Sequence, residues 1–159
     1  MGSIEIAFLI EASLNGHTQI VSALIANGAL VNAHPKKGFS SLFVAALNGY
    51  YDAVNVLLEA GAVVNAQNYT GISSLMISSH QGHTQIVKVL IENGALVNVH
   101  DNYGMPSLFL AALNGHYDTV NILLGAGADV NVQNNIKTSS LMISSHQGHT
   151  QTVKVLIQM

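Results

Sequence analysis

The sequence predicts an all-α solenoid of about five stacked helix-turn-helix units, and three features of the chain lead to this prediction. A tripeptide of the type Asn/Gln-Gly-His/Tyr occurs five times at intervals of 33 residues, at 15–17, 48–50, 81–83, 114–116 and 147–149. Two short segments with helical spacing of apolar residues recur in each interval. A longer period is superimposed, because residues 73–91 match 139–157 at 18 of 19 positions. Units of this size must stack on their neighbours to bury an apolar face.

The first helix of each unit is expected around a recurring leucine and is expected to end at the glycine of the tripeptide. The leucines are Leu9, Leu42, Leu75, Leu108 and Leu141. Ser40, Ser73 and Ser139 stand where a side-chain oxygen can accept the free N–H groups of a helix start. The glycine can adopt the left-handed conformation that stops a helix. We therefore predict short first helices whose leucines are buried in the core.

The second helix of each unit has a valine followed by apolar residues three and four positions later, as in Val87, Leu90 and Ile91. This spacing gives the helix one apolar face. A glycine and then turn-forming residues follow, as in the segment 101–104. We expect a single array over residues 1–159, with units at approximately 2–34, 35–67, 68–100, 101–133 and 134–159 and the last unit truncated.

These residues resemble the ankyrin repeat family, whose unit has 33 residues. The matching segments are 127–131 (Gly-Ala-Asp-Val-Asn), 41–46 (Ser-Leu-Phe-Val-Ala-Ala) and the Gly-His pairs. The chain departs from the family pattern where Thr-Pro becomes Ser-Ser at 40, 73 and 139 or Pro106-Ser107, and where a histidine becomes phenylalanine or methionine. The resemblance implies an ankyrin solenoid with protruding turns and a concave face that holds partner proteins.

Composition and charge exclude several classes of function. The chain has 5 lysines, 8 acidic residues, no arginine and a net charge of -3, so it offers no basic stripe for nucleic acid. No apolar run approaches the length that membrane insertion requires. Cysteine is absent, which excludes disulfides and thiolate metal sites. Cytoplasmic localisation is the default expectation.

The candidate catalytic and metal-binding residues favour a structural interpretation. Histidines lie three apart in the pairs His80 and His83, and His146 and His149, but no acidic residue or cysteine accompanies them. The histidines that follow glycine are expected to satisfy local backbone groups, as the family resemblance implies. No glycine-rich phosphate loop and no complete catalytic constellation is present. We expect no enzyme activity, no cofactor and no metal.

The resemblance implies that the turn before each first helix and the exposed end of that helix line a binding groove. The turns also offer Ile4, Ile6, Lys36 and Lys37. Apolar residues are unusual in exposed turns, which indicates contact with a partner; the alternative for each is packing onto a neighbouring turn. We expect a protein or peptide partner with an apolar, near-neutral helix or extended segment. The predicted binding residues are Phe39, Leu47, Tyr69, Ile72, His80, Tyr103, Met105, Leu113, Ile136 and His146.

The two ends of the array lead to a second hypothesis. The first unit begins with the apolar residues Ile4, Ile6, Phe8 and Ile10, and the last stops at Met159 before a helix-ending glycine. Terminal units of a free solenoid normally have a polar outer face. One interpretation is a fragment of a longer array. The other is a structural array whose uncapped ends join copies into homo-oligomers.

Overall fold

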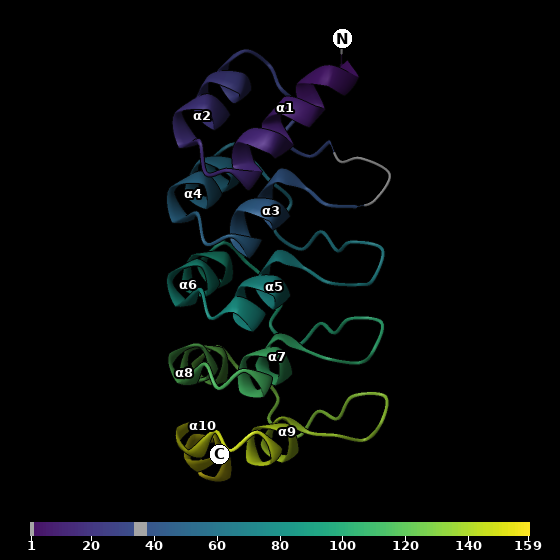
Figure 1. The fold of residues 1–159 in the computed structure, drawn as a ribbon, viewed down its shortest axis with the longest axis vertical. Helices are drawn as coiled ribbons and strands as arrows, with labels where there is room; N and C mark the ends of the chain where they lie inside the picture. Colours follow the sequence, from purple (N-terminus) through teal and green to yellow (C-terminus); the bar gives the residue numbers. More distant parts are fainter. Residues whose placement is uncertain (1, 34–37) are drawn as a thin grey trace.

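The computed structural model describes residues 2–33 and 38–159, with side chains from residue 7 onward, and it is a stack of helix pairs (Figure 1). Lys36 and Lys37 lie outside these ranges. An inner column of helices stands between an outer column and a row of protruding turns. The inner helices are α1 (Gly2–Leu14), α3 (Ser41–Leu47), α5 (Ser74–Gln81), α7 (Ser107–Leu113) and α9 (Ser140–His146). The outer helices are α2 (Thr18–Ala26), α4 (Tyr51–Glu59), α6 (Thr84–Glu92), α8 (Tyr117–Gly125) and α10 (Thr150–Ile157).

One continuous core runs between the two columns. Leu9, Leu42, Leu75 and Leu108 are each 1% exposed, which confirms the predicted role of the inner-helix leucines. On the three middle outer helices, α4, α6 and α8, the valine and the leucine three positions later, as in Val87 and Leu90, are fully buried. Leu141 in α9 is only half-buried. Each unit therefore depends on its neighbours to cover its leucine.

Serine side chains define the starts of three inner helices, as predicted. Ser40, Ser73 and Ser139 each accept a hydrogen bond on Oγ from the backbone N–H three residues later, at 3.1, 3.2 and 3.3 Å. Helix α7 begins after Pro106, which has an extended conformation and no hydroxyl to accept such a bond. The fourth unit thus lacks this side-chain cap.

Three of the four histidines that follow glycine bind the neighbouring unit rather than local groups, which corrects the expectation from the sequence. His83 Nε2 lies 3.1 Å from the carbonyl oxygen of Leu47, 36 residues earlier. His116 and His149 make the same contact with the carbonyls of His80 and Leu113, both at 3.0 Å. A carbonyl only accepts, so Nε2 carries the proton in each case. Each ring ties the end of one inner helix to the next unit.

Asparagine side chains form a second set of bonds between units, beyond the ends of the outer helices. Asn65 Nδ2 donates to the carbonyl of Gly94 at 3.0 Å, and its Oδ1 accepts from the N–H of Leu96 at 2.9 Å. Asn32 and Asn98 bind the following unit in the same two-bond pattern. These bonds fix the spacing and register of the stack at three successive interfaces.

The protruding turns are called fingers here and comprise residues 67–73, 100–106 and 133–139, each closed by one β-bridge. A side-chain oxygen organises each finger. Asp101 Oδ1 accepts from the N–H groups of Tyr103 and Met105 at 2.9 and 2.8 Å. Asn68 and Asn134 act in the same way. Neighbouring fingers are joined by bonds such as Asn135 N–H to the carbonyl of Tyr103, at 3.0 Å.

The first unit differs from the prediction because its backbone is helical from Gly2. Ile4 and Ile6 therefore belong to α1, and the turn expected around them is wrong. The physical reason lies in the local sequence: residues 3–7 contain none of the glycine, asparagine or aspartate residues that shape the other fingers.

Lys137 adopts a left-handed conformation with φ of 65° at the position that glycine occupies in the other fingers. This conformation costs an L-residue roughly 1–2 kcal/mol. Glycine would remove that strain but lose more entropy on folding. We expect Lys137→Gly to raise the free energy of unfolding by about 0.5–1 kcal/mol in urea denaturation. Gly104→Ala is the control in the opposite direction, since its Cβ would lie 2.6 Å from Asn135 Oδ1. An unchanged midpoint for Lys137→Gly would contradict the strain argument.

Candidate functional site

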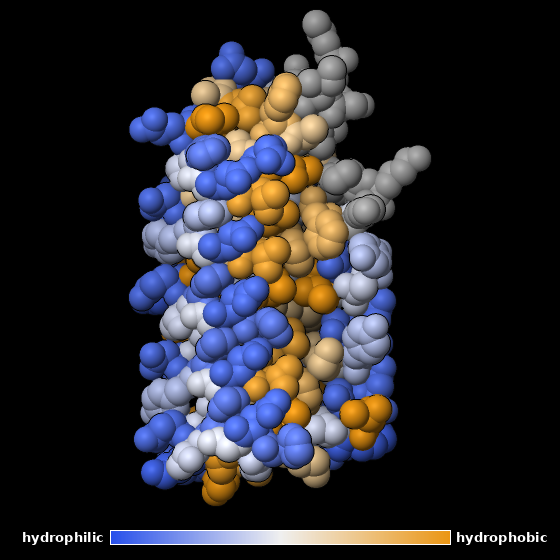
Figure 2. Space-filling model, in the orientation of Figure 1, coloured by the Kyte–Doolittle hydropathy of each residue, from blue (hydrophilic) through white to orange (hydrophobic). Residues whose placement is uncertain are grey.

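Hydrophobic side chains form a band along the inner column of helices (Figure 2). Hydrophilic residues of the outer helices border it on one side and those of the fingers on the other. In α3, Leu42, Ala45 and Ala46 belong to the core cluster, while Val44 and Leu47, three residues apart, share another face, where Val44 is 6% exposed and Leu47 is half-buried. We use the name apolar stripe for the residues that lie along this band. Phe39, Ile72 and Met105 precede the inner helices, Val44, Ile77, Leu110 and Ile143 lie within them, and Leu47, His80, Leu113 and His146 lie near their ends.

Most of the predicted binding residues in this stripe are half-buried. Phe39, Ile72 and Met105 are partly covered, as are Leu47, His80 and Leu113, while His146 is exposed. Their positions agree with a shallow surface that a partner can reach. Their role in binding stays a prediction.

Phe39 also packs within the array. Its ring centroid lies 5.2 Å from that of Phe43, a buried residue of α3, and 6.2 Å from that of Tyr69 in an edge-on arrangement. Such aromatic pairs add roughly 0.5–1.5 kcal/mol beyond area burial. For Phe39, therefore, packing onto a neighbouring turn accounts for part of its burial.

The finger tips expose three large apolar side chains. Tyr69 is 68% exposed, Tyr103 63% and Ile136 80%. Tyr69 is the first residue after the organising side chain of its finger, whereas Tyr103 and Ile136 are the second. These three side chains are not buried by packing within the array, so they are available to a partner.

His80 stands at the centre of the stripe, between Leu47 and Leu113 of the neighbouring units. Its Nδ1 atom is buried and makes no hydrogen bond within the described residues, and its carbonyl accepts from His116 and Asn114. Helices α3 and α7, which flank α5, have no ionisable side chains. Helix α6 packs against α5; His83 precedes it, and its own ionisable side chains, Lys88 and Glu92, are exposed.

Asp101 is a site residue that sequence reasoning missed. It is 5% exposed and lies in a finger in which no role was predicted for an acidic residue. Its carboxylate accepts two backbone N–H bonds, so it shapes the finger rather than presenting charge to a partner. The signal was available, because Asn68, Asp101 and Asn134 are spaced 33 apart and all carry an Oδ1 oxygen.

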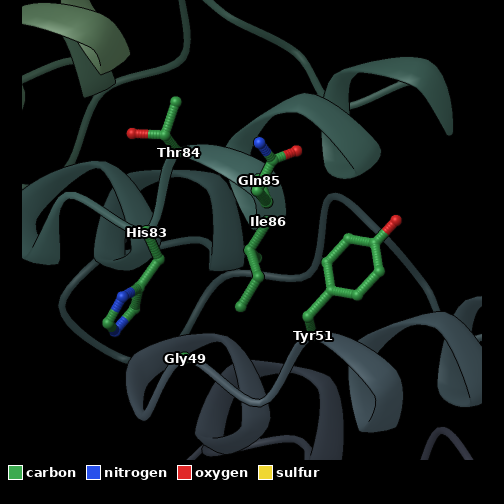
Figure 3. A pocket seen from close by; sticks show the side chains of 6 residues that line it. All are labelled: Gly49, Tyr51, His83, Thr84, Gln85 and Ile86. Atoms are coloured by element: carbon green, nitrogen blue, oxygen red, sulfur yellow. The ribbon is translucent and has the colours of Figure 1, made fainter.

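An open hollow of about 550 Å³ lies at the turns between the inner and outer helices (Figure 3). Gly49, Tyr51, His83, Thr84, Gln85 and Ile86 line it. Two of its polar side chains already have partners, since His83 binds the Leu47 carbonyl and Thr84 Oγ1 lies 2.9 Å from Thr119 Oγ1. A similar hollow recurs at Gly16–Ile20. The hollow is therefore a feature of the repeat geometry.

Nothing in the described part of the chain assembles a metal site, since no group of three or more ligating side chains comes together there. Over the same residues, no helix has the length and apolar character needed to cross a bilayer.

Stacked helix pairs with fingers bonded in register define a helical-repeat protein. The family model described as "Ankyrin repeats (3 copies)" matches residues 5–68 and 65–134, and the chain belongs to the ankyrin repeat family. Ankyrin arrays are generally protein–protein interaction modules and are typically not enzymes. A comparison with curated proteins gives no match.

Proposed function

We propose that this ankyrin array is a non-catalytic module that binds an apolar, near-neutral segment of another protein along the apolar stripe. The observation that carries the proposal is the continuous hydrophobic band in Figure 2, which is bordered by the finger row. Helices α3, α5, α7 and α9 contribute no acidic or basic side chain to it other than His80 and His146. A charged partner segment would lose hydration there without gaining an opposite charge.

The exposed finger tips supply the anchors in this proposal. Tyr69 and Tyr103 present large rigid rings with few rotatable bonds, which is why tyrosine is enriched among residues that dominate binding energy. The backbone beneath Tyr103 is fixed by its bond to Asp101, so little order has to be created on binding. Binding energy then comes from the burial of the finger tips, and of Leu47 and Leu113 in the stripe, against the partner.

The test replaces one finger residue and one stripe residue together. We expect Tyr103→Ser with Leu113→Ser to change the free energy of unfolding by no more than about 1 kcal/mol, because both residues are partly exposed. The same variant should lose the partner that the intact chain captures in a pull-down. Circular dichroism and urea titration measure the first effect.

A matched control separates this surface from any exposed apolar residue. Leu96→Ser with Tyr117→Ser removes two exposed side chains that lie outside the stripe. Leu96 is 60% exposed in the loop after α6, and Tyr117 is 43% exposed in α8. This control should retain the same captured protein. Capture that survives the stripe variant, or that is lost in both variants, would place the binding site elsewhere.

Two exposed positions favour self-assembly as a second candidate function. Ile20 is 51% exposed, whereas the equivalent residues of the other units are between 0% and 2% exposed (Ala53, Ile86, Thr119 and Thr152). Met142 is 54% exposed, whereas Phe43, Met76 and Phe109 are 5% or less. These end faces resemble halves of an internal interface. Light scattering across a dilution series tests assembly, and a constant monomer mass would exclude it.

A further inference from the structure

We infer that the partner segment is an amphipathic α-helix lying along the stripe, with one stripe-facing side chain every seven residues, alternately apolar and neutral hydrogen-bonding. The inference rests on the proposed function and identifies the chemistry of the partner.

The spacing of the inner helices fits two turns of a partner helix. Helices α3, α5, α7 and α9 pack directly on one another in that order. Packed helices lie roughly 8–10 Å apart. Seven residues of an α-helix rise by about 10.5 Å and return to nearly the same face. A helix laid along the stripe therefore presents one side chain to each successive unit.

The backbone groups beside the stripe favour a helix over an extended peptide. The N–H groups of Ile72, Met105 and Thr138 point to the organising oxygens of their own fingers, at 2.9, 2.8 and 3.0 Å. They are therefore not free to pair with an added strand. An extended segment buried here would leave its own N–H and C=O groups unpaired, whereas a helix pairs them internally.

The side chains near the helix ends alternate with the 66-residue period of the sequence. Leu47 and Leu113 occupy this position in α3 and α7, and His80 and His146 occupy it in α5 and α9. His80 is half-buried; its Nδ1 atom is buried within the array without a hydrogen bond to a described residue, so Nε2 is the ring nitrogen that a partner can reach. A leucine faces an apolar side chain best, while an imidazole pressed against one loses its hydrogen bonds with water. The partner should therefore alternate between the two chemistries over 14 residues.

The test uses designed helical peptides of four heptads, whose outward faces carry equal numbers of lysine and glutamate. The alternating peptide has leucine and glutamine in turn at the stripe-facing position, and the uniform peptide has leucine at all four. A third peptide has the alternating composition in scrambled order, and a fourth contains prolines that keep it extended. Fluorescence anisotropy with the intact chain measures each Kd.

We expect the alternating peptide to bind about tenfold more tightly than the scrambled peptide, and more tightly than the extended one. In the variant His80→Leu with His146→Leu, the ratio of the Kd values of the uniform and alternating peptides should shift about tenfold in favour of the uniform peptide. Circular dichroism verifies that the variant folds. An unchanged ratio would overturn the alternation.

The outcomes separate this inference from the proposed function. Tighter binding of the extended peptide, or no binding of any peptide, would overturn the helix inference, while the pull-down with Tyr103→Ser and Leu113→Ser still judges the proposed function. Peptide binding that is equal in the parent chain and in that double variant would contradict both, because the peptide would then lie off the stripe.

Discussion

Replacing Leu75 by alanine is expected to lower the free energy of unfolding by roughly 2–5 kcal/mol. Leu75 is 1% exposed at the centre of the array, in a helix that packs against α3, α6 and α7. Removing its side chain leaves a cavity between three units, and the bonded fingers and histidines on either side limit how far those units can move to fill it.

Urea denaturation followed by circular dichroism measures this loss. The control is Leu96→Ala, in which the same atoms are removed from a leucine that is 60% exposed. It should change the free energy of unfolding by no more than about 0.5 kcal/mol. Because a solenoid couples only neighbouring units, we also expect Leu75→Ala to broaden the transition, since the array is weakened at its middle. A loss below about 1 kcal/mol would mean that the central units repack freely.

Much of this fold could be predicted from the sequence because its determinants are local and repeat. The helix-capping serines, the left-handed glycines and the core leucines each act within a few residues, and the 33-residue period shows them several times. The serine bonds at Ser40, Ser73 and Ser139 confirm this reasoning. The first unit breaks the pattern, and there the turn predicted around Ile4 and Ile6 is wrong.

The contacts between units were harder to predict. His83 contacts a carbonyl that lies 36 residues earlier in the sequence. This contact depends on the distance between stacked units, which a local sequence pattern does not predict. The packing of Phe39 on Phe43 and Tyr69 likewise depends on how the turn leans over α3. Of the candidate site, the sequence indicated seven residues that lie along the apolar stripe and three, Tyr69, Tyr103 and Ile136, that lie at the finger tips. It did not indicate Asp101, which holds the finger beneath Tyr103 and Met105.

The glycine before each of these histidines offers a direct measure of the contact between units. Gly82 has φ of +72°, and a Cβ added there would lie 2.5 Å from the ring of His116. We expect Gly82→Ala to lower the free energy of unfolding by roughly 2–4 kcal/mol. About 1–2 kcal/mol comes from the left-handed backbone, and the rest from displacing the imidazole from the His80 carbonyl.

Gly148 is the matched control because it occupies the same position in the fifth unit. Its φ is +75°, yet an added Cβ meets no atom within 4 Å. Gly148→Ala should therefore carry the backbone cost alone. Subtracting its effect from that of Gly82→Ala, both measured by urea denaturation, isolates the cost of moving the ring, which should be at least about 1 kcal/mol. Equal losses would show that the imidazole relocates freely, so the bonds from His83, His116 and His149 would not hold the units in register.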